Sequence, residues 1–375
     1  MLPRVPACTP PLPPAMRKPP PPSAGQSVRL IDIAAQAGVS ATVVSAVLKG
    51  HTGGRGTIRV GAAKAQRIRQ LAARMNYRPN LLAQALKGER SNVIGVLIGA
   101  DSTPANYERL GALEREADRR GCRLMIGQFH DDAPRTAEYL QDFRGRGIDM
   151  LMCFHNPAPR YDRATLTQFR LFRGVVFQTA TSIPNTCVVD VDRAAGVQAA
   201  VEHLAQRGRC RIALVLNTTP ARDPLMMARW RGYRQGLQAV GLAFDPALVW
   251  TGDGRFPPVP ECVQQAVTQL TRTSVNSGGG GMDAVVASND VWAMALLKVL
   301  RRTGFRVPGD VAVVGFDNLL AASLFDPALT TIDPNHPAFA AAAVDLLLKL
   351  RAQEKLSPRQ KRIIVPPLLV TRETS

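Results

Sequence analysis

The spacing of apolar residues changes twice along this 375-residue chain. Residues 1–27 are rich in proline and contain almost nothing to bury, which predicts a disordered tail. Residues 28–78 carry apolar residues at helical spacing and predict short helices. From residue 92 onward, fully apolar runs alternate with helix-like stretches. The pattern therefore predicts a tail, a small helical head and a large α/β core.

The head has the spacing of a helix-turn-helix, a unit whose second helix normally lies in the major groove of DNA. Gly38 allows the positive φ of a tight turn, and Ser40 is a suitable N-cap for the second helix. A third helix is expected over residues 62–75. The residues expected to face inward are Ile33, Ala34 and Ala37, then Val44, Val47 and Leu48, then Ile68, Leu71 and Ala72.

The core contains apolar runs that lack in-and-out alternation and are separated by helix-like segments. Such runs predict parallel sheets covered on both faces, and the length suits two doubly wound lobes. The expected fold class is therefore α/β, with an all-α helix-turn-helix head on a two-lobed, doubly wound core. The expected strands are VIGVLIGA, CRLMIGQF, IDMLMCF, GVVFQTA, RIALVLN, DAVVAS and VAVVGFD.

The net charge of +18 indicates a polyanionic partner, nucleic acid before membrane. Residues 1–90 hold fourteen Lys and Arg against only Asp32 and Glu89, so most of the surplus lies at the head. A solubilising basic tail is the alternative. No signal sequence opens the chain and no apolar run approaches the length of a membrane span, so we expect a soluble cytoplasmic protein without a membrane partner.

The sequence offers little catalytic chemistry. Its six cysteines have no CxxC or CxxH spacing, its five histidines lie apart, and it contains no HExxH or GxSxG motif. Glycines 278–281 are not followed by the GK[ST] of a phosphate loop. We therefore expect no enzyme activity, no metal site and no cofactor.

A series of motifs follows in order along the chain: DIAAQAGVS at Asp32, YRPN at Tyr77, SNVIGVLI at Ser91, VDVDRAAG at Val189, RWRGYRQGL at Arg229, SNDVWAMALLKVL at Ser288, VPGDVAVVGFDN at Val307 and ALTTID at Ala328. With these motifs the chain resembles the LacI/GalR family of bacterial transcription regulators from Val28 to the C-terminus. The resemblance implies a helix-turn-helix, a hinge helix that orders on DNA, and a periplasmic-binding-protein-like core that holds a small effector between two lobes. It also implies a homodimer on near-palindromic, double-stranded operator DNA.

The resemblance also suggests domain boundaries. Lobe 1 of the core is expected at about 92–190 and 333–362, and lobe 2 at about 191–332 and 363–372. The expected segments are the tail at 1–27, the helix-turn-helix domain at 28–78, the hinge helix or linker at 79–91 and the core at 92–375.

The second helix carries few side chains suited to reading bases. In the family, positions matching Ala41, Thr42 and Ala46 commonly face the major groove, and the one at Ala46 is usually arginine. The polar residues left here are Thr42, Ser45 and Lys49, which predicts weak base reading tilted toward A·T-rich half-sites. A degenerate domain whose second helix only packs is the alternative.

Two further segments are candidates for DNA contacts. Arg55 and Arg59 lie in HTGGRGTIRVG, which is longer than its family counterpart and can follow a phosphate line or be a plain surface insertion. The hinge PNLLAQALKG matches the family closely, and the match places Leu86 as a wedge in the minor groove with Ala83 beside it. An ordinary core leucine is the alternative for Leu86. The YRPN match adds Tyr77 and Asn80 to the expected DNA interface.

Three residues match the family's contacts to polar ligand atoms: Arg229, Asn289 and Asp317. Guanidinium and carboxylate groups suit a polyol, since one donates hydrogen bonds in pairs and the other accepts them. A helix N-cap is the alternative for Asn289, and a turn cap is the alternative for Asp317.

The N-terminal lobe departs from the family pattern. An aromatic pair usually follows the proline matching Pro104, but Ala105 and Asn106 stand here, and Thr179 replaces an expected aspartate. Gln178 and Asp101 complete the candidate effector-binding residues.

These observations predict a sequence-specific repressor whose operator affinity is controlled by a small effector, a sugar, bound between the lobes. A periplasmic-type sugar-binding protein without DNA function is one alternative, against which the basic head argues. A regulator that has lost effector binding is the other.

Overall fold

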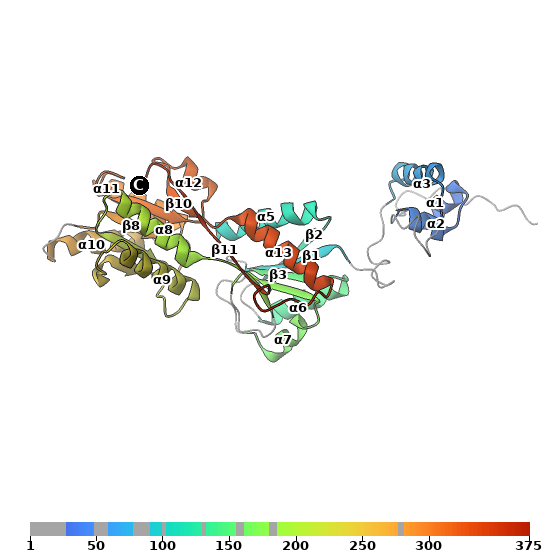
Figure 1. The fold of residues 1–375 in the computed structure, drawn as a ribbon, viewed down its shortest axis with the longest axis horizontal. Helices are drawn as coiled ribbons and strands as arrows, with labels where there is room; N and C mark the ends of the chain where they lie inside the picture. The colour runs from blue at the N-terminus through green and yellow to red at the C-terminus, as the bar shows by residue number, and fades with distance from the viewer. Residues whose placement is uncertain are drawn as a thin grey trace, which may run out of the picture. The chain divides into compact units, whose positions relative to one another are not determined.

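The computed structural model describes residues 28–48, 59–77, 91–99, 103–129, 133–154, 161–179, 186–276 and 281–375. The chain divides into two compact units, residues 1–87 and residues 88–375 (Figure 1). Each has a hydrophobic core of its own. The first unit is all-α where it is described, and the second combines two sheets with helices, so the predicted α/β fold class is confirmed.

The described part of the first unit is a helical head that contains the predicted helix-turn-helix. Gly38 ends the first helix with a φ of 64°, and the Val43 amide donates to Ser40 Oγ at 3.4 Å. The side chains of Ile33, Val44 and Ile68 are fully buried together. The predicted turn, N-cap and inward faces are therefore confirmed. The helices are α1 (Leu30–Ala37), α2 (Ala41–Leu48) and α3 (Ala62–Arg74).

No single helix among the described residues is long and apolar enough to cross a membrane. Helices α1 and α2 pass that test only as a pair, which is bent by 104° at the turn between them. Their apolar faces already pack into the core of the head.

Lobe 1 of the second unit is a parallel six-stranded sheet in the order β11-β5-β4-β3-β1-β2. Strand β1 lies between β3 and the edge strand β2, and it places Ile94 opposite Met150 of β3. The strands are β1 (Val93–Gly99), β2 (Arg123–Phe129), β3 (Met150–Phe154), β4 (Gly174–Phe177), β5 (Cys187–Val191) and β11 (Arg362–Val365). The helices of this lobe are α5 (Pro104–Arg119), α6 (Ala133–Gly145), α7 (Arg163–Phe169) and α13 (His336–Arg351).

Lobe 2 is a second six-stranded sheet in the order β12-β10-β9-β8-β6-β7. Its pairings are parallel except that of β10 with β12. The strands are β6 (Ile212–Leu216), β7 (Val249–Thr251), β8 (Ala284–Ala287), β9 (Ala312–Phe316), β10 (Thr330–Asp333) and β12 (Leu368–Val370). The helices are α8 (Arg193–Gln206), α9 (Pro224–Ala239), α10 (Pro260–Asn276), α11 (Asp290–Arg302), α12 (Leu320–Leu324) and a 3-10 turn at Pro246–Leu248.

The C-terminal segment corrects the expected lobe boundaries. Residues 363–365 were expected in lobe 2, but they belong to β11 and pair with β5 in the sheet of lobe 1. Lobe 2 also extends beyond residue 372, since the Val313 amide donates to Thr374 O at 2.8 Å. Strand β12 is antiparallel because the chain enters lobe 2 from the end of β11, on the side where the parallel strand β10 ends.

Helices α8 and α9 cross at two glycines of α9. A Cβ built on Gly232 would lie 2.1 Å from Ala194 O, and one on Gly236 would lie 2.7 Å from Val201 Cβ. The missing side chains therefore let the two helices touch backbone to backbone. This contact fixes α9, which carries Arg229, against α8.

We expect Gly232→Ala to destabilise the protein by about 1–3 kcal/mol, because the new methyl group must push the two helices apart. Gly111→Ala is a matched control within helix α5, where the nearest neighbour of the new Cβ would be Arg115 Nη1 at 3.5 Å. This control should be neutral or stabilising, since alanine favours helix over glycine by up to about 1 kcal/mol. Denaturant unfolding measures the free energy of unfolding of both variants. Equal changes in the two would contradict the close contact of α8 and α9 at Gly232.

Candidate functional site

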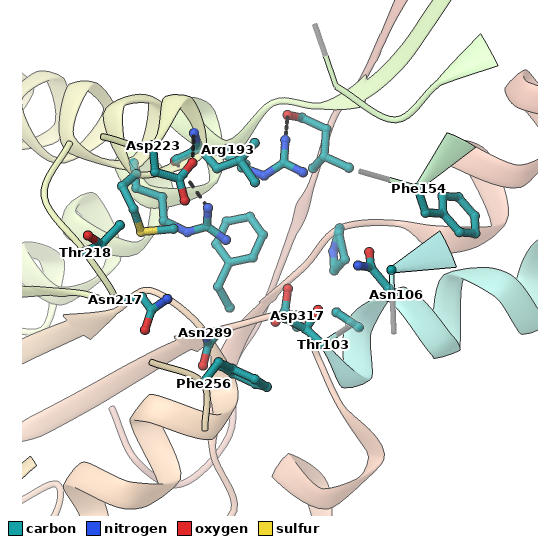
Figure 2. Close-up of a pocket in the computed structure, with 18 of the residues that line it drawn as sticks. Thr103, Asn106, Phe154, Arg193, Asn217, Thr218, Asp223, Phe256, Asn289 and Asp317 are labelled. Atoms are coloured by element: carbon teal, nitrogen blue, oxygen red, sulfur yellow. Dashed lines mark hydrogen bonds between the residues drawn. The ribbon is translucent and has the colours of Figure 1, made fainter. Parts of the chain in front are cut away.

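A cavity of about 490 Å³ lies between the two lobes of the second unit. Its lining includes the carboxyl ends of parallel strands from both sheets: Gly99 ends β1, Phe154 ends β3 and Asn217 follows β6. Ligands of open parallel sheets occupy such positions, and the volume suits a small molecule. In Figure 2, Asn106 and Phe154 form one wall, and Asn217 and Asn289 face them from the other.

Helix α9 carries Arg229 into the cavity from lobe 2. Asp223 caps this helix by accepting the Leu225 amide at 2.7 Å. Arg229 Nε donates to Ser288 O at 2.9 Å, and Nη1 donates to Leu225 O at 3.3 Å. Its guanidinium lies 4.7 Å from the ring centre of Phe316. The group is 6% exposed, so it is aimed at the cavity in a fixed orientation.

Asp317 lies on the cavity wall directly after β9. Its φ of 119° is rare for a residue with a side chain, and its amide donates to Ile332 O at 2.8 Å. The following Asn318, with a φ of 52°, is tied down by Arg372 Nη2 at 2.6 Å. The unusual turn therefore holds the carboxylate at the edge of the sheet, where a ligand hydroxyl can reach it.

Asn289 caps a helix and also lines the cavity, so the two alternatives for this residue are compatible. Its Oδ1 accepts the Trp292 amide at 2.9 Å and caps α11, and the residue also lines the cavity. Because the oxygen is used by the cap, the amide Nδ2 is the group that can donate to a ligand.

Lobe 1 contributes Arg109, which sequence reasoning did not select. Arg109 Nη1 donates to Gln178 Oε1 at 2.6 Å and to Asn106 Oδ1 at 3.3 Å. Its guanidinium lies 4.8 Å from the ring centre of Phe339. Gln178 is buried behind this arginine and is not part of the cavity lining, so its place is to orient Arg109.

Arg193 is a second arginine that sequence reasoning missed, although it lies in the VDVDRAAG motif. It forms a close ion pair with Asp190 and donates to Val191 O at 3.2 Å. A usable signal existed for Arg109, since a charged residue on the apolar stripe of a helix is unusual. Among the described residues, no cluster of His, Cys, Asp and Glu could hold a metal ion.

Burial shifts the pKa values of the charged groups around the cavity. It raises the pKa of Asp317 to about 7, an effect to which nearby Asp290 adds and which Arg229 and Arg109 oppose. Burial also lowers the pKa of Arg109 and of Arg229 to about 10 each, which leaves both charged at neutral pH. Asp317 can therefore either accept or donate a hydrogen bond to a ligand near neutral pH.

The helical head presents few polar side chains on α2. Thr42 is exposed, while Ser45 and Ala46 are partly buried. Arg59 is exposed, and Tyr77 lies partly buried against the core of the head. The exposed cations on α3 are Lys64, Arg67, Arg69 and Arg74.

Several candidates lie outside the residues that the structure describes. For the DNA interface these are Lys49, Arg55, Asn80, Ala83 and Leu86, and for the effector site Asp101.

Comparisons with known proteins cover both units. Residues 29–80 match a model of bacterial regulatory proteins of the lacI family, and residues 201–375 match a periplasmic binding protein-like domain. The ribose operon repressor of Escherichia coli (strain K12) is 27% identical over 344 residues, which cover 91% of this chain and 98% of that protein.

Solved structures share the fold. The Lac repressor dimer bound to operator and the anti-inducer ONPF has a TM-score of 0.72 at 23% identity, covering 93% of this chain and 99% of its own. A LacI-family protein from Sanguibacter keddieii DSM 10542 is 30% identical with a TM-score of 0.61, covering 76% of this chain and 98% of its own. The chain therefore belongs to the LacI family of bacterial regulatory proteins.

Proposed function

We propose that this protein is a transcriptional repressor whose affinity for a near-palindromic operator is set by a small effector, a sugar, bound between the lobes of the core. The observation that carries the proposal is the convergence of Arg229 and Asp317 from lobe 2 with Arg109 and Asn106 from lobe 1 in one cavity. The same chain carries a basic helix-turn-helix head. A ligand that touches both walls would favour one angle between the lobes.

In this proposal, DNA affinity comes mainly from phosphate contacts. The described part of α2 offers Thr42 and Ser45 as its polar side chains, neither of which makes the bidentate contacts of arginine with guanine. The exposed cations of α3 and Arg59 supply a sequence-independent attraction instead. The hinge residues Ala83 and Leu86, assigned by family resemblance, would add selectivity through deformation of the duplex.

Effector chemistry follows from the cavity walls. Asp317 and the Nδ2 of Asn289 provide an acceptor and a donor at the edge of the lobe 2 sheet, and Phe316 and Phe256 add apolar surface. Hydroxyl groups on a compact apolar ring fit this combination. The ribose operon repressor bears the name of a sugar operon, which agrees with this choice.

A contact outside the cavity links the lobes and provides a route for coupling. The Leu320 amide in α12 donates to Glu108 Oε1 in α5 at 3.3 Å, and these helices belong to different lobes. A change of lobe angle must lengthen or shorten this contact. The face around it therefore senses effector binding.

The same face is our proposed dimer surface. Two apolar side chains of α12, Leu320 and Leu324, are 70% and 76% exposed, and Tyr107 and Ile126 of lobe 1 are 44% and 51% exposed. Exposed apolar side chains gathered in this way mark interaction surfaces. A lobe movement at a dimer surface would change the separation of the two heads on the operator.

This assignment favours a regulator over a periplasmic-type binding protein, because a ligand carrier has no use for a helix-turn-helix head. The proposed role includes no catalytic step and places the protein in the cytoplasm, where its operator is.

DNA binding should depend on the head and on salt. We expect the full chain to bind its own upstream DNA with a steep fall of log K against log salt, since each phosphate contact contributes a slope of about −0.9. A chain beginning at Asn92 should stay folded and lose this affinity. Electrophoretic shift and circular dichroism measure the two properties, and full DNA affinity in the shortened chain would rule out the assignment.

Arg229→Ala and Asp317→Ala should each weaken effector binding at least about tenfold, because losing a charged partner of a buried polar group costs about 1.5–3 kcal/mol. Ligand-free operator affinity should stay near wild type. Calorimetry with an effector found by screening sugars, beside operator titrations with and without it, measures both. Asp317→Asn keeps the shape of the turn and checks that any loss reflects charge. Unchanged effector affinity in all three variants would show that the site lies elsewhere.

Leu324→Asp should dissociate the dimer, because a carboxylate in a buried apolar contact is strongly unfavourable. Leu171→Asp is the control, since Leu171 is also exposed, at 49%, but lies after α7 in lobe 1. Sedimentation velocity should find a monomer for the first variant and a dimer for the second. Dimers in both would place the interface on another face.

A further inference from the structure

The cavity between the lobes has an excess of positive charge among the described residues. Asp223 is engaged as the cap of α9, which leaves Asp317 as the carboxylate that points freely at the cavity. The charged groups of the described lining are the arginines Arg109, Arg193, Arg222 and Arg229 and the aspartates Asp223 and Asp317.

Two of these arginines have only neutral hydrogen-bond partners. Arg193 has a charged partner of its own, since it forms an ion pair with Asp190. Arg109 bonds instead to the amide oxygens of Gln178 and Asn106, and Arg229 bonds to backbone carbonyls. Within the described chain, neither Arg109 nor Arg229 forms an ion pair with a carboxylate, and Arg109 Nε has no hydrogen-bond partner.

Burial of these two guanidinium groups is energetically unfavourable in the ligand-free protein. Arg109 is 4% exposed and Arg229 is 6% exposed. A buried charge whose partners are neutral loses hydration without gaining a full ion pair. A guanidinium also presents paired N–H groups that match carboxylate and phosphate oxygens.

The two guanidinium groups come from opposite lobes but share one electrostatic environment. Arg109 belongs to α5 of lobe 1, and Arg229 belongs to α9 of lobe 2. Burial is the main cause that lowers the pKa of each, and the charge of Arg193 lowers both further. An anion between them would relieve this repulsion and bond to both lobes at once.

We propose that the effector carries a carboxylate or phosphate group in addition to hydroxyls, and that Arg109 and Arg229 hold this group between the lobes. Asp317 then faces a hydroxyl of the same molecule, since it would repel the anionic group. The proposal rests on the function proposed above and names the chemical class of its effector: sugar acids or sugar phosphates. A neutral sugar would leave the two arginines without a charged partner and would close the lobes less effectively.

Calorimetry on the full chain at fixed ionic strength tests this with matched probes: glucose, glucuronate and glucose 6-phosphate, and ribose, ribonate and ribose 5-phosphate. At least one anion should bind about tenfold or more tightly than its neutral parent, because charge-assisted hydrogen bonds replace neutral ones. The uronate, ribonate and phosphate members distinguish a carboxylate from a phosphate. If no anion in the panel exceeds its neutral parent, the proposal is wrong.

Arg109→Gln should bring the affinity for the anion down toward that of its neutral parent, since glutamine has no charge to pair with the anionic group. Arg109→Lys should keep part of the preference, which separates lost charge from lost folding. Arg163→Gln is the matched control, because Arg163 is exposed on α7 of the same lobe and does not line the cavity. If both variants lose the preference for the anion equally, the preference comes from the overall positive charge of the protein and not from a site at Arg109.

Operator titrations without ligand keep the two proposals apart. If the wild-type protein binds its operator but shows no anion preference, only the effector class is wrong. If it binds no operator DNA at all, the proposed function fails whatever the calorimetry finds.

Discussion

The direction of the parallel strands is the constraint on which the cleft depends. Every parallel strand of the two sheets ends toward the space between the lobes, and the chain passes between lobes after β5, β10 and β11. Side chains at those strand ends must therefore meet in the same place. Asn217, Asn289 and Asp317 are brought together in this way, although about a hundred residues separate the first from the last.

Polar groups in this position have to be held by neighbours, because a buried charge without hydrogen-bond partners is unfavourable. Arg229 is fixed by Ser288 and Leu225, and Arg109 by Gln178 and Asn106. These supports use neutral oxygens, so the orientation of each guanidinium is fixed while its charge remains available. The guanidinium groups are thereby oriented without a ligand, and such preorganisation lowers the entropy cost of binding where a ligand is bound.

A movement of the lobes can change the surface of the core, because a helix of lobe 1 contacts a helix of lobe 2 there. Glu108 in α5 and Leu320 in α12 are linked at one face, and α5 also carries Arg109 on its buried side. One helix thus connects the cavity wall to a surface with exposed apolar side chains. A ligand that shifts this helix changes both the cavity wall and the exposed apolar surface. Such a shared element is the physical requirement for coupling between two sites.

Local patterns in the sequence were sufficient for the helices of the head and for seven strands of the core, because apolar periodicity reflects burial directly. The matched motifs also led to Arg229, Asn289 and Asp317, all of which line the cavity. Short edge strands such as β7 and β12 contain too few residues for a periodic pattern of apolar residues to be recognised.

Arg109 illustrates what the sequence by itself left open. In the sequence, Arg109 is a charged residue on the apolar stripe of a helix. Such a residue can be either an exposed surface cation or a buried group that contacts a ligand. The sequence determined the elements, the two units and the basic head, because these depend on neighbours along the chain. Only the tertiary structure decided that Arg109 meets Gln178 and lines the same cavity as Arg229, since this cavity joins strand ends and helices from two lobes.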